Sequence, residues 1–188
     1  ALHLCKLGYI YLDNICAYDT KTNILIDVFL NAVKRLNPNM SSSDASMLFS
    51  KIVNMSNNDD LGREFYQLLS ANSGIKLIDF ENPDNNDWHV TTEFTCENED
   101  TEDEFRPDIT CFVNGLPLAF IEVKKPNNHE GILAERERIN KRMSKSCFRR
   151  FFNLTQLMIF SNNQEYDNES RVPIQGAFYC CTAKTKAF

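Results

Sequence analysis

Residues 106–124 read RPDITCFVNGLPLAFIEVK, and this stretch decides the fold because it has the pattern of a β-hairpin. The pair Asn114-Gly115 is the strongest short-range signal for a hairpin turn, and it separates predicted strands at 108–113 and 116–124. The run Leu116–Ile121 is continuously apolar, as is typical of a strand buried at the centre of a sheet.

Charged residues stand at the open end of this hairpin. Alternation puts Glu122 and Lys124 on one face of their strand, and Asp108 opens the partner strand. A strict two-residue loop would set Asp108 opposite Ile121. A three-residue loop, or a bulge beside Gly115, would instead set it opposite Glu122. Directly opposed Cβ atoms lie about 5 Å apart, close enough for two carboxylates to share a divalent cation, so we predict a three-residue loop or a bulge.

These residue types suit metal-assisted phosphodiester hydrolysis. Two close carboxylates repel each other unless a cation lies between them, and Mg²⁺, for which Mn²⁺ can substitute, prefers oxygen ligands. A bound metal lowers the pKa of its water and offsets charge on a phosphodiester, while Lys124 is placed to hold the attacking water or to stabilise the oxyanion. A strand-end salt bridge from Lys124 to Glu122 or Asp108 fits the spacing equally well. The hairpin and the apolar run favour the catalytic interpretation.

The other segments predict an α/β fold with a mixed central β-sheet flanked by helices. Helices are indicated at 23–33, at 45–55 with N-cap candidates at 41–44, and at 61–71, and a long basic helix at 131–152. Further strands are expected at 75–80, 88–96, 157–161 and 176–182, and the acidic stretch 97–104 is expected to be a loop. We predict one domain over 1–188, with a helical N-terminal part at 1–72, a catalytic core at 75–183, and a metal site at the sheet edge near Asp108 and Glu122.

Composition limits the class of protein. At 188 residues, with 43% hydrophobic residues, the chain is long enough for a soluble domain with its own core. Its apolar runs are far shorter than the roughly 20 residues that a membrane-spanning helix needs. The seven cysteines show no Cys-x-x-Cys spacing, so reduced cytoplasmic cysteines are expected rather than zinc ligands or disulfides. The start without Met predicts a fragment of a longer protein.

Charge is unevenly distributed along the chain. The net charge of −6 argues against a generally basic nucleic-acid-binding protein, yet residues 122–150 hold nine Lys or Arg against four Glu. This basic segment fits either a contact with DNA phosphates or a solvated helix face.

The 106–124 stretch closely resembles the nuclease motif of the restriction (R) subunit of type I restriction–modification enzymes, which belongs to the PD-(D/E)xK nuclease superfamily. Residues 62–66 with 75–80, and residues 154–163, also look like that domain, so the resemblance covers most of the chain from about Leu61. It implies a restriction-endonuclease-like core with an N-terminal helical segment. The site residues that it implies are the metal ligands Asp108, Glu122 and the main-chain carbonyl of Val123, the catalytic Lys124, and Glu64 as a further acid. Surface solvation explains Glu64 equally well.

Many relatives carry a Gln-x-x-x-Tyr pair on the helix after the lysine, and this chain departs from that pattern. The best correspondence places Arg138 and Arg142 there, on one face of a helix. Either these arginines contact DNA phosphate or the correspondence lies elsewhere. The expected DNA contacts are Lys125, Arg138, Arg142 and Lys145.

By the same resemblance the protein is bacterial or archaeal and cytoplasmic, needs Mg²⁺, acts on double-stranded DNA and has no membrane partner. The full-length protein would continue into an ATP-driven translocase and assemble with methylation and specificity subunits. ATP is not expected to bind here, because no Gly-x-x-x-x-Gly-Lys-Ser/Thr loop occurs. Two alternatives are a non-cleaving docking module of the same fold and a repair nuclease or junction resolvase. The intact Asp108, Glu122 and Lys124 argue against the first, and the surrounding motif argues against the second.

Overall fold

The computed structural model describes residues 1–13, 15, 17–71, 74–96, 104–125, 131–161, 169 and 178–181. Its helices are α1 (Leu2–Lys6), α2 (Ile26–Leu36), α3 (Ser42–Met55), α4 (Arg63–Leu69), α5 (Gly131–Met143) and α6 (Arg149–Leu154), with 3₁₀ turns η1 (Pro83–Asn85) and η2 (Ser146–Phe148). Its strands are β1 (Ile10–Tyr11), β2 (Trp88–Thr92), β3 (Ile109–Val113), β4 (Leu116–Val123), β5 (Leu157–Ser161) and β6 (Phe178–Cys181). Within these ranges no helix is both long and apolar enough to cross a lipid bilayer.

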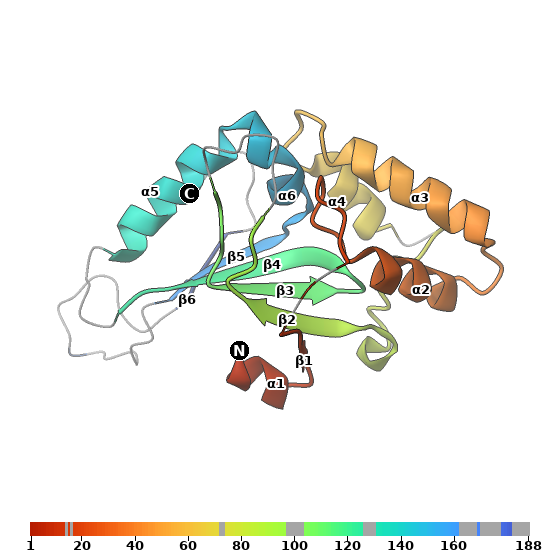
Figure 1. Cartoon of the computed structure of the whole chain (residues 1–188), viewed down its shortest axis with the longest axis horizontal. Coiled ribbons are helices and arrows are strands. Elements are labelled where there is room, and N and C mark those ends of the chain that lie inside the picture. The colour runs from red at the N-terminus through yellow and green to blue at the C-terminus, as the bar shows by residue number, and fades with distance from the viewer. Residues whose placement is uncertain are drawn as a thin grey trace.

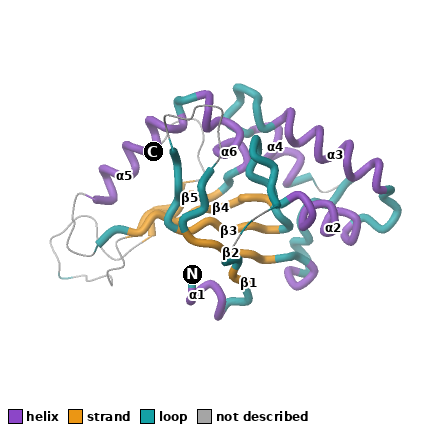
Figure 2. Tube along the Cα trace, viewed as in Figure 1, coloured by secondary structure: helices purple, strands orange, loops and turns teal. Residues whose placement is uncertain are grey.

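The strands form one mixed sheet in the order β1-β2-β3-β4-β5-β6. β1 runs parallel to β2 and β4 runs parallel to β5, whereas the other neighbouring pairs are antiparallel. Helices α3, α4, α5 and α6 all lie on the upper side of the sheet in the view of Figures 1 and 2. The predicted α/β fold with a mixed, helix-flanked sheet is confirmed, and it is consistent with a restriction-endonuclease-like core.

The position of the predicted site within the sheet differs from the expectation. β3 and β4 are central strands, because β2 and β5 pair with their outer sides. Asp108 and Glu122 therefore lie where two central strands end and not beside an edge strand. The apolar run of β4 agrees with this central place, because Leu116, Leu118 and Phe120 are buried and Ala119 and Ile121 on the other face are still partly buried.

Three predicted helices are present with shifted ends, as α2, α3 and α4. The cap of α3 is the clearest local signal, because Ser41 Oγ accepts a hydrogen bond from the Asp44 backbone N–H (3.1 Å) and the Asp44 carboxylate accepts one from the Ser41 N–H (3.1 Å). This reciprocal capping box fixes the residue at which the helix begins. The two-residue β1 is too short for a sequence pattern to reveal, and it adds a strand to the N-terminal part that was predicted to be helical.

Residues 75–80 form no strand, contrary to the prediction, because their polar groups bond to η1 instead of to a sheet. The Asp79 backbone N–H donates to the side-chain oxygen of Asn86 (2.9 Å). The Asp79 carboxylate accepts from the backbone N–H groups of Glu81 and Asn82 (3.1 and 3.0 Å). Side-chain bonds of this kind compete with the ladder of a strand.

The long helix predicted over 131–152 is interrupted. α5 ends at Met143, and the Ser144 hydroxyl donates back to a carbonyl four residues earlier (3.1 Å). Lys145 then adopts extended backbone dihedrals (φ −90°, ψ 130°) before η2 and α6. The break redirects the chain so that Phe151 of α6 is buried in the core.

Two hydrophobic clusters hold the helices against the sheet. One packs α2, α3 and α4 around the turn of the β3–β4 hairpin and includes Phe29, Ile52, Phe65 and Leu116. The other lies under α5 and α6, and at its centre the ring of Phe105 contacts those of Phe120, Phe148, Phe151 and Phe152. Phe105 precedes Asp108 by three residues, so this cluster anchors the chain where it enters β3.

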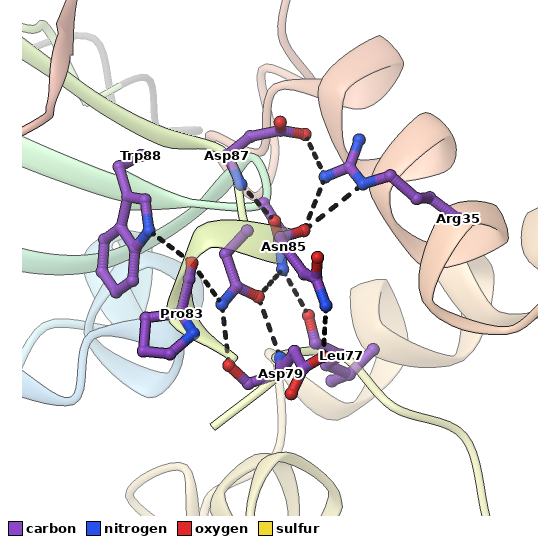
Figure 3. Close-up of polar contacts among 9 residues, drawn as sticks. Arg35, Leu77, Asp79, Pro83, Asn85, Asp87 and Trp88 are labelled. Carbon is purple, nitrogen blue, oxygen red and sulfur yellow. Dashed lines mark hydrogen bonds and ion pairs between the residues drawn. The ribbon is translucent and has the colours of Figure 1, made fainter. Parts of the chain in front are cut away.

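A polar network fixes the turn of the hairpin, at the end opposite the charged residues (Figure 3). Asn114 has a left-handed φ of 50°, and its amide donates to the carbonyl of Leu77 (2.8 Å) and to the side-chain oxygen of Asn86 (2.9 Å). Its own side-chain oxygen accepts from the Asp87 backbone N–H (2.8 Å), and Arg35 of α2 pairs with the Asp87 carboxylate (2.8 Å). The turn is thus bound directly to two other segments, at Leu77 and at Asn86 with Asp87, and Asp87 joins it to α2, which fixes the strands that leave the turn.

Candidate active site

The register of the hairpin brings Asp108 level with Glu122. Ile109 pairs with Ile121, and one further residue along each strand sets Asp108 opposite Glu122. The loop keeps two residues, and the shift arises at a bulge next to Pro117, which has no N–H to donate to the ladder. The predicted register is confirmed, although the bulge lies farther from the turn than expected.

Backbone and side-chain bonds together hold Asp108. Its backbone carbonyl accepts from the Glu93 N–H (3.1 Å), which ties it to the end of β2. Its carboxylate crosses to β4 and accepts from the Val123 N–H (2.7 Å). The side chain is half-buried, so one carboxylate oxygen is fixed by the protein at the mouth of the hairpin.

Glu122 is a buried acid, with 5% of its surface exposed. Burial first, and then the charges of Glu135 and Asp108, raise the pKa of Glu122 to about 7 against the opposing effect of Lys124. A carboxylate in this position is costly to ionise without a cation. The site therefore has a deficit of positive charge that a bound cation would relieve.

Lys124 lies among the acids. Its Nζ is 3.6 Å from Glu122 Oε2 and 2.7 Å from Glu135 Oε2, and its backbone N–H donates to the Ser161 carbonyl of β5 (2.7 Å). The salt bridge to Glu122 that the spacing allowed is present, and the structure adds a closer one. The Lys124 side chain is still 22% exposed, so it can also face a ligand.

Sequence patterns did not reveal Glu135, which belongs to the site. It lies on α5, is 1% exposed, and pairs with both Lys124 and Arg138. The sequence feature that could have indicated Glu135 is its helical spacing from Ile132 and Ile139, both of which are buried. A charged residue on the apolar face of a helix indicates a buried partner, but only the packing of α5 shows which partner.

The other predicted site residues divide into near and distant ones. Arg138 reaches the acids through Glu135, and Lys125 follows Lys124 as an exposed residue. Lys145 lies beyond the end of α5. Glu64 lies at the start of α4 and accepts from the Asn58 amide. Figure 1 shows α4 away from the start of α5. No described contact joins Glu64 to the hairpin acids, and its proposed role stays a prediction.

Part of the basic segment serves the fold instead of facing solvent. The Arg142 guanidinium lies 4.8 Å from the centre of the Phe105 ring and donates to the Glu104 carbonyl (3.4 Å). Arg150 donates to the carbonyl of Val53 near the end of α3 (2.8 Å). The excess of positive charge in 122–150 is therefore not all available to DNA.

The donors at the hairpin mouth suit a hard divalent cation. Within the described ranges no three His, Cys, Asp or Glu side chains form a ready-made metal cluster. The oxygen donors that the register brings level at the hairpin mouth are the carboxylates of Asp108 and Glu122. Oxygen donors of this kind, few in number, suit Mg²⁺, which keeps several waters. Thr110, two residues along the same strand face as Asp108, is fully buried, and its hydroxyl has no hydrogen-bond partner among the residues that the structure describes. An unpaired buried hydroxyl there fits a site that gains a polar ligand.

Comparison with known proteins relates the chain to type I restriction enzymes. The family described as type I restriction enzyme R protein N terminus matches residues 1–167. A protein of Methanocaldococcus jannaschii, named as the MjaIXP type I restriction enzyme endonuclease subunit, is 31% identical over 123 residues. That match covers 57% of this chain and 12% of the longer protein. Because the family matches most of its length, the chain belongs to the family of N-terminal regions of type I restriction enzyme R proteins.

Proposed function

We propose that this domain hydrolyses phosphodiester bonds of double-stranded DNA with Mg²⁺, for which Mn²⁺ can substitute. The observation that carries the proposal is the juxtaposition of Asp108 and Glu122 at the open end of a buried hairpin, with the Lys124 ammonium beside them. Membership of the restriction-enzyme family supports the same reaction class.

Three groups would hold the metal: the carboxylates of Asp108 and Glu122 and the main-chain carbonyl of Val123. When bound, Mg²⁺ supplies Lewis-acid stabilisation of the phosphate and a water of lowered pKa. Asp108 is held in place through the Val123 N–H (2.7 Å), so its second carboxylate oxygen remains for a ligand. Glu122, 5% exposed, presents its carboxylate in surroundings with little competing water.

Lys124 supplies the positive charge that the reaction needs near the phosphate. Its ammonium lies on the same strand face as Glu122 and within 3.6 Å of it. From there it can orient the attacking water or stabilise negative charge that develops on the phosphate oxygens.

Exposed cations beside the site would contact the DNA backbone. Arg138, with 56% of its side chain exposed, pairs with Glu135, and the exposed Lys125 follows Lys124; we expect weaker roles for Arg142 and Lys145. Such contacts bind phosphate without reading sequence. Choice of the DNA site would then rest with a specificity subunit, modification with a methylation subunit, and ATP-driven translocation with other parts of the full-length protein.

A docking module that keeps the fold without cleaving is the competing function. The pairing of Lys124 with Glu135 at 2.7 Å favours it, because a closed ion pair can serve structure alone. The two functions differ in one respect, which is whether the acids are needed for cleavage.

The test uses the intact restriction enzyme with Asp108→Asn, Glu122→Gln or Lys124→Gln in this domain. Each variant should lose DNA cleavage while ATP hydrolysis and translocation continue. The matched control is Asp59→Asn, whose carboxylate is 88% exposed on the surface and which should cleave normally. Cleavage at the wild-type rate by any of the three site variants would reject the assignment and favour the docking module.

A further inference from the structure

Glu135 is an acid in a place where packing alone calls for an apolar residue. It lies on α5 between Ile132 and Ile139, one helical turn from each, and is 1% exposed. The two isoleucines already pack α5 into the aromatic cluster above the sheet. A buried ion pair often contributes no more stability than an apolar side chain of the same size, so the fold gives little reason for a carboxylate here.

One carboxylate oxygen atom of Glu135 forms ion pairs with two cationic side chains. Lys124 Nζ lies 2.7 Å from Glu135 Oε2, and the guanidinium of Arg138 pairs with the same Oε2. Lys124 is farther from Glu122, at 3.6 Å. Of the two acids beside the ammonium, Glu135 is the closer partner, and this leaves the Glu122 carboxylate available to another cation.

The two cations come from different elements. Lys124 directly follows the central strand β4, whereas Arg138 lies one helical turn beyond Glu135 on α5. Lysine and arginine side chains are long and flexible, and each loses much rotamer freedom when it is fixed. A shared buried carboxylate fixes both before a ligand arrives, and prior positioning of charged groups is a large part of catalysis of phosphate chemistry.

We infer that Glu135 is a positioning residue, which holds the Lys124 ammonium and the Arg138 guanidinium together at the mouth of the hairpin so that both face the bound phosphodiester. This inference rests on the proposed function. Without Glu135, the ammonium would have Glu122 as its remaining acidic partner among these contacts, and it would then occupy the carboxylate that the metal needs.

The test compares Glu135→Gln and Glu135→Asp with wild type in the intact restriction enzyme. Gln keeps the shape of the side chain and removes its charge, whereas Asp keeps the charge on a shorter side chain. We expect the cleavage rate at saturating DNA to fall on the order of 10- to 100-fold in Glu135→Gln, with partial recovery in Glu135→Asp. The DNA concentration for half-maximal cleavage and the rate of ATP hydrolysis should change little. Glu137→Gln, an exposed acid on the same helix, is the matched control.

Each result decides the role of Glu135. Wild-type cleavage by Glu135→Gln would overturn the inference, and so would a lowered melting temperature with loss of both cleavage and translocation, which would assign Glu135 to the fold. Glu122→Gln is measured in parallel. If Glu122→Gln is inactive while Glu135→Gln cleaves normally, only the positioning role fails. If Glu122→Gln also cleaves normally, the proposed function itself fails.

Discussion

Replacing Glu122 with Gln should stabilise the metal-free domain at alkaline pH. The pKa of Glu122 in the folded protein is about 7, raised mainly by burial, against about 4.3 for an exposed glutamate. At pH values between these two pKa values, Glu122 therefore keeps its proton in the folded state and has lost it in the unfolded state. Stability from the protonated acid is fully present below about pH 4 and is lost as the pH rises through 7.

The size of the effect follows from the difference between the two pKa values. Each pH unit between them is worth about 1.4 kcal/mol, so the raised pKa of Glu122 costs the folded state roughly 3 kcal/mol at pH 8 and roughly 1 kcal/mol at pH 5. Gln has nearly the same shape and carries no charge. It should therefore be more stable than wild type by about these amounts, and roughly 3 kcal/mol corresponds to roughly 6 to 12 °C in Tm for a chain of this length.

The assay is thermal unfolding of the 188-residue chain in EDTA, at pH 5 and at pH 8. Glu137→Gln, in which an exposed acid of α5 is replaced, should show no such pH-dependent gain. The reasoning is refuted if the advantage of Glu122→Gln over wild type does not increase between pH 5 and pH 8. It is also refuted if the variant is less stable at both values.

Three further predictions concern the metal and the packing that fixes the site. Adding Mg²⁺ at pH 8 should raise the Tm of wild type but not of Glu122→Gln, since a ligand stabilises only the state that binds it; equal shifts would place the metal elsewhere. Gly115→Ala should destabilise the chain by at least about 2 kcal/mol, because its Cβ would lie 2.6 Å from the Leu25 carbonyl oxygen. Gly74→Ala, whose added Cβ would have no atom within 4 Å, should cost less when both variants are unfolded in urea. Asn153→Ala should cost roughly 2 kcal/mol, because the buried amide donates to two carbonyls that follow α3 (2.9 and 2.8 Å); an unchanged midpoint of unfolding would contradict it.

The hairpin and its charged residues could be predicted because short-range sequence patterns specify them. The Asn114-Gly115 pair and the apolar run specify turn and strand within one short stretch. The register was predicted from the requirement that Asp108 meet Glu122, and the structure meets it with a bulge next to Pro117. Local patterns did not show where along the strand that bulge would lie.

Features set by tertiary contacts could not be predicted. Residues 75–80 have the composition of a strand, but Asp79 bonds to side-chain and backbone groups around η1 instead. Glu135 follows Lys124 by 11 residues in the chain. Its role could be recognised only from the packing of α5, which brings its carboxylate to the Lys124 ammonium. The predicted division into an N-terminal part and a catalytic core, and the acidic stretch 97–103, which lies outside the described residues, remain predictions.

The most direct measurement of the central claim is the position of a divalent cation in the protein. Crystals of the 188-residue chain soaked in Mn²⁺ allow the metal to be located by its anomalous scattering. We predict one or more peaks between the carboxylates of Asp108 and Glu122, and none there in crystals of Glu122→Gln. Mn²⁺ bound at other positions, with no peak between these two carboxylates in wild-type crystals, would contradict the account.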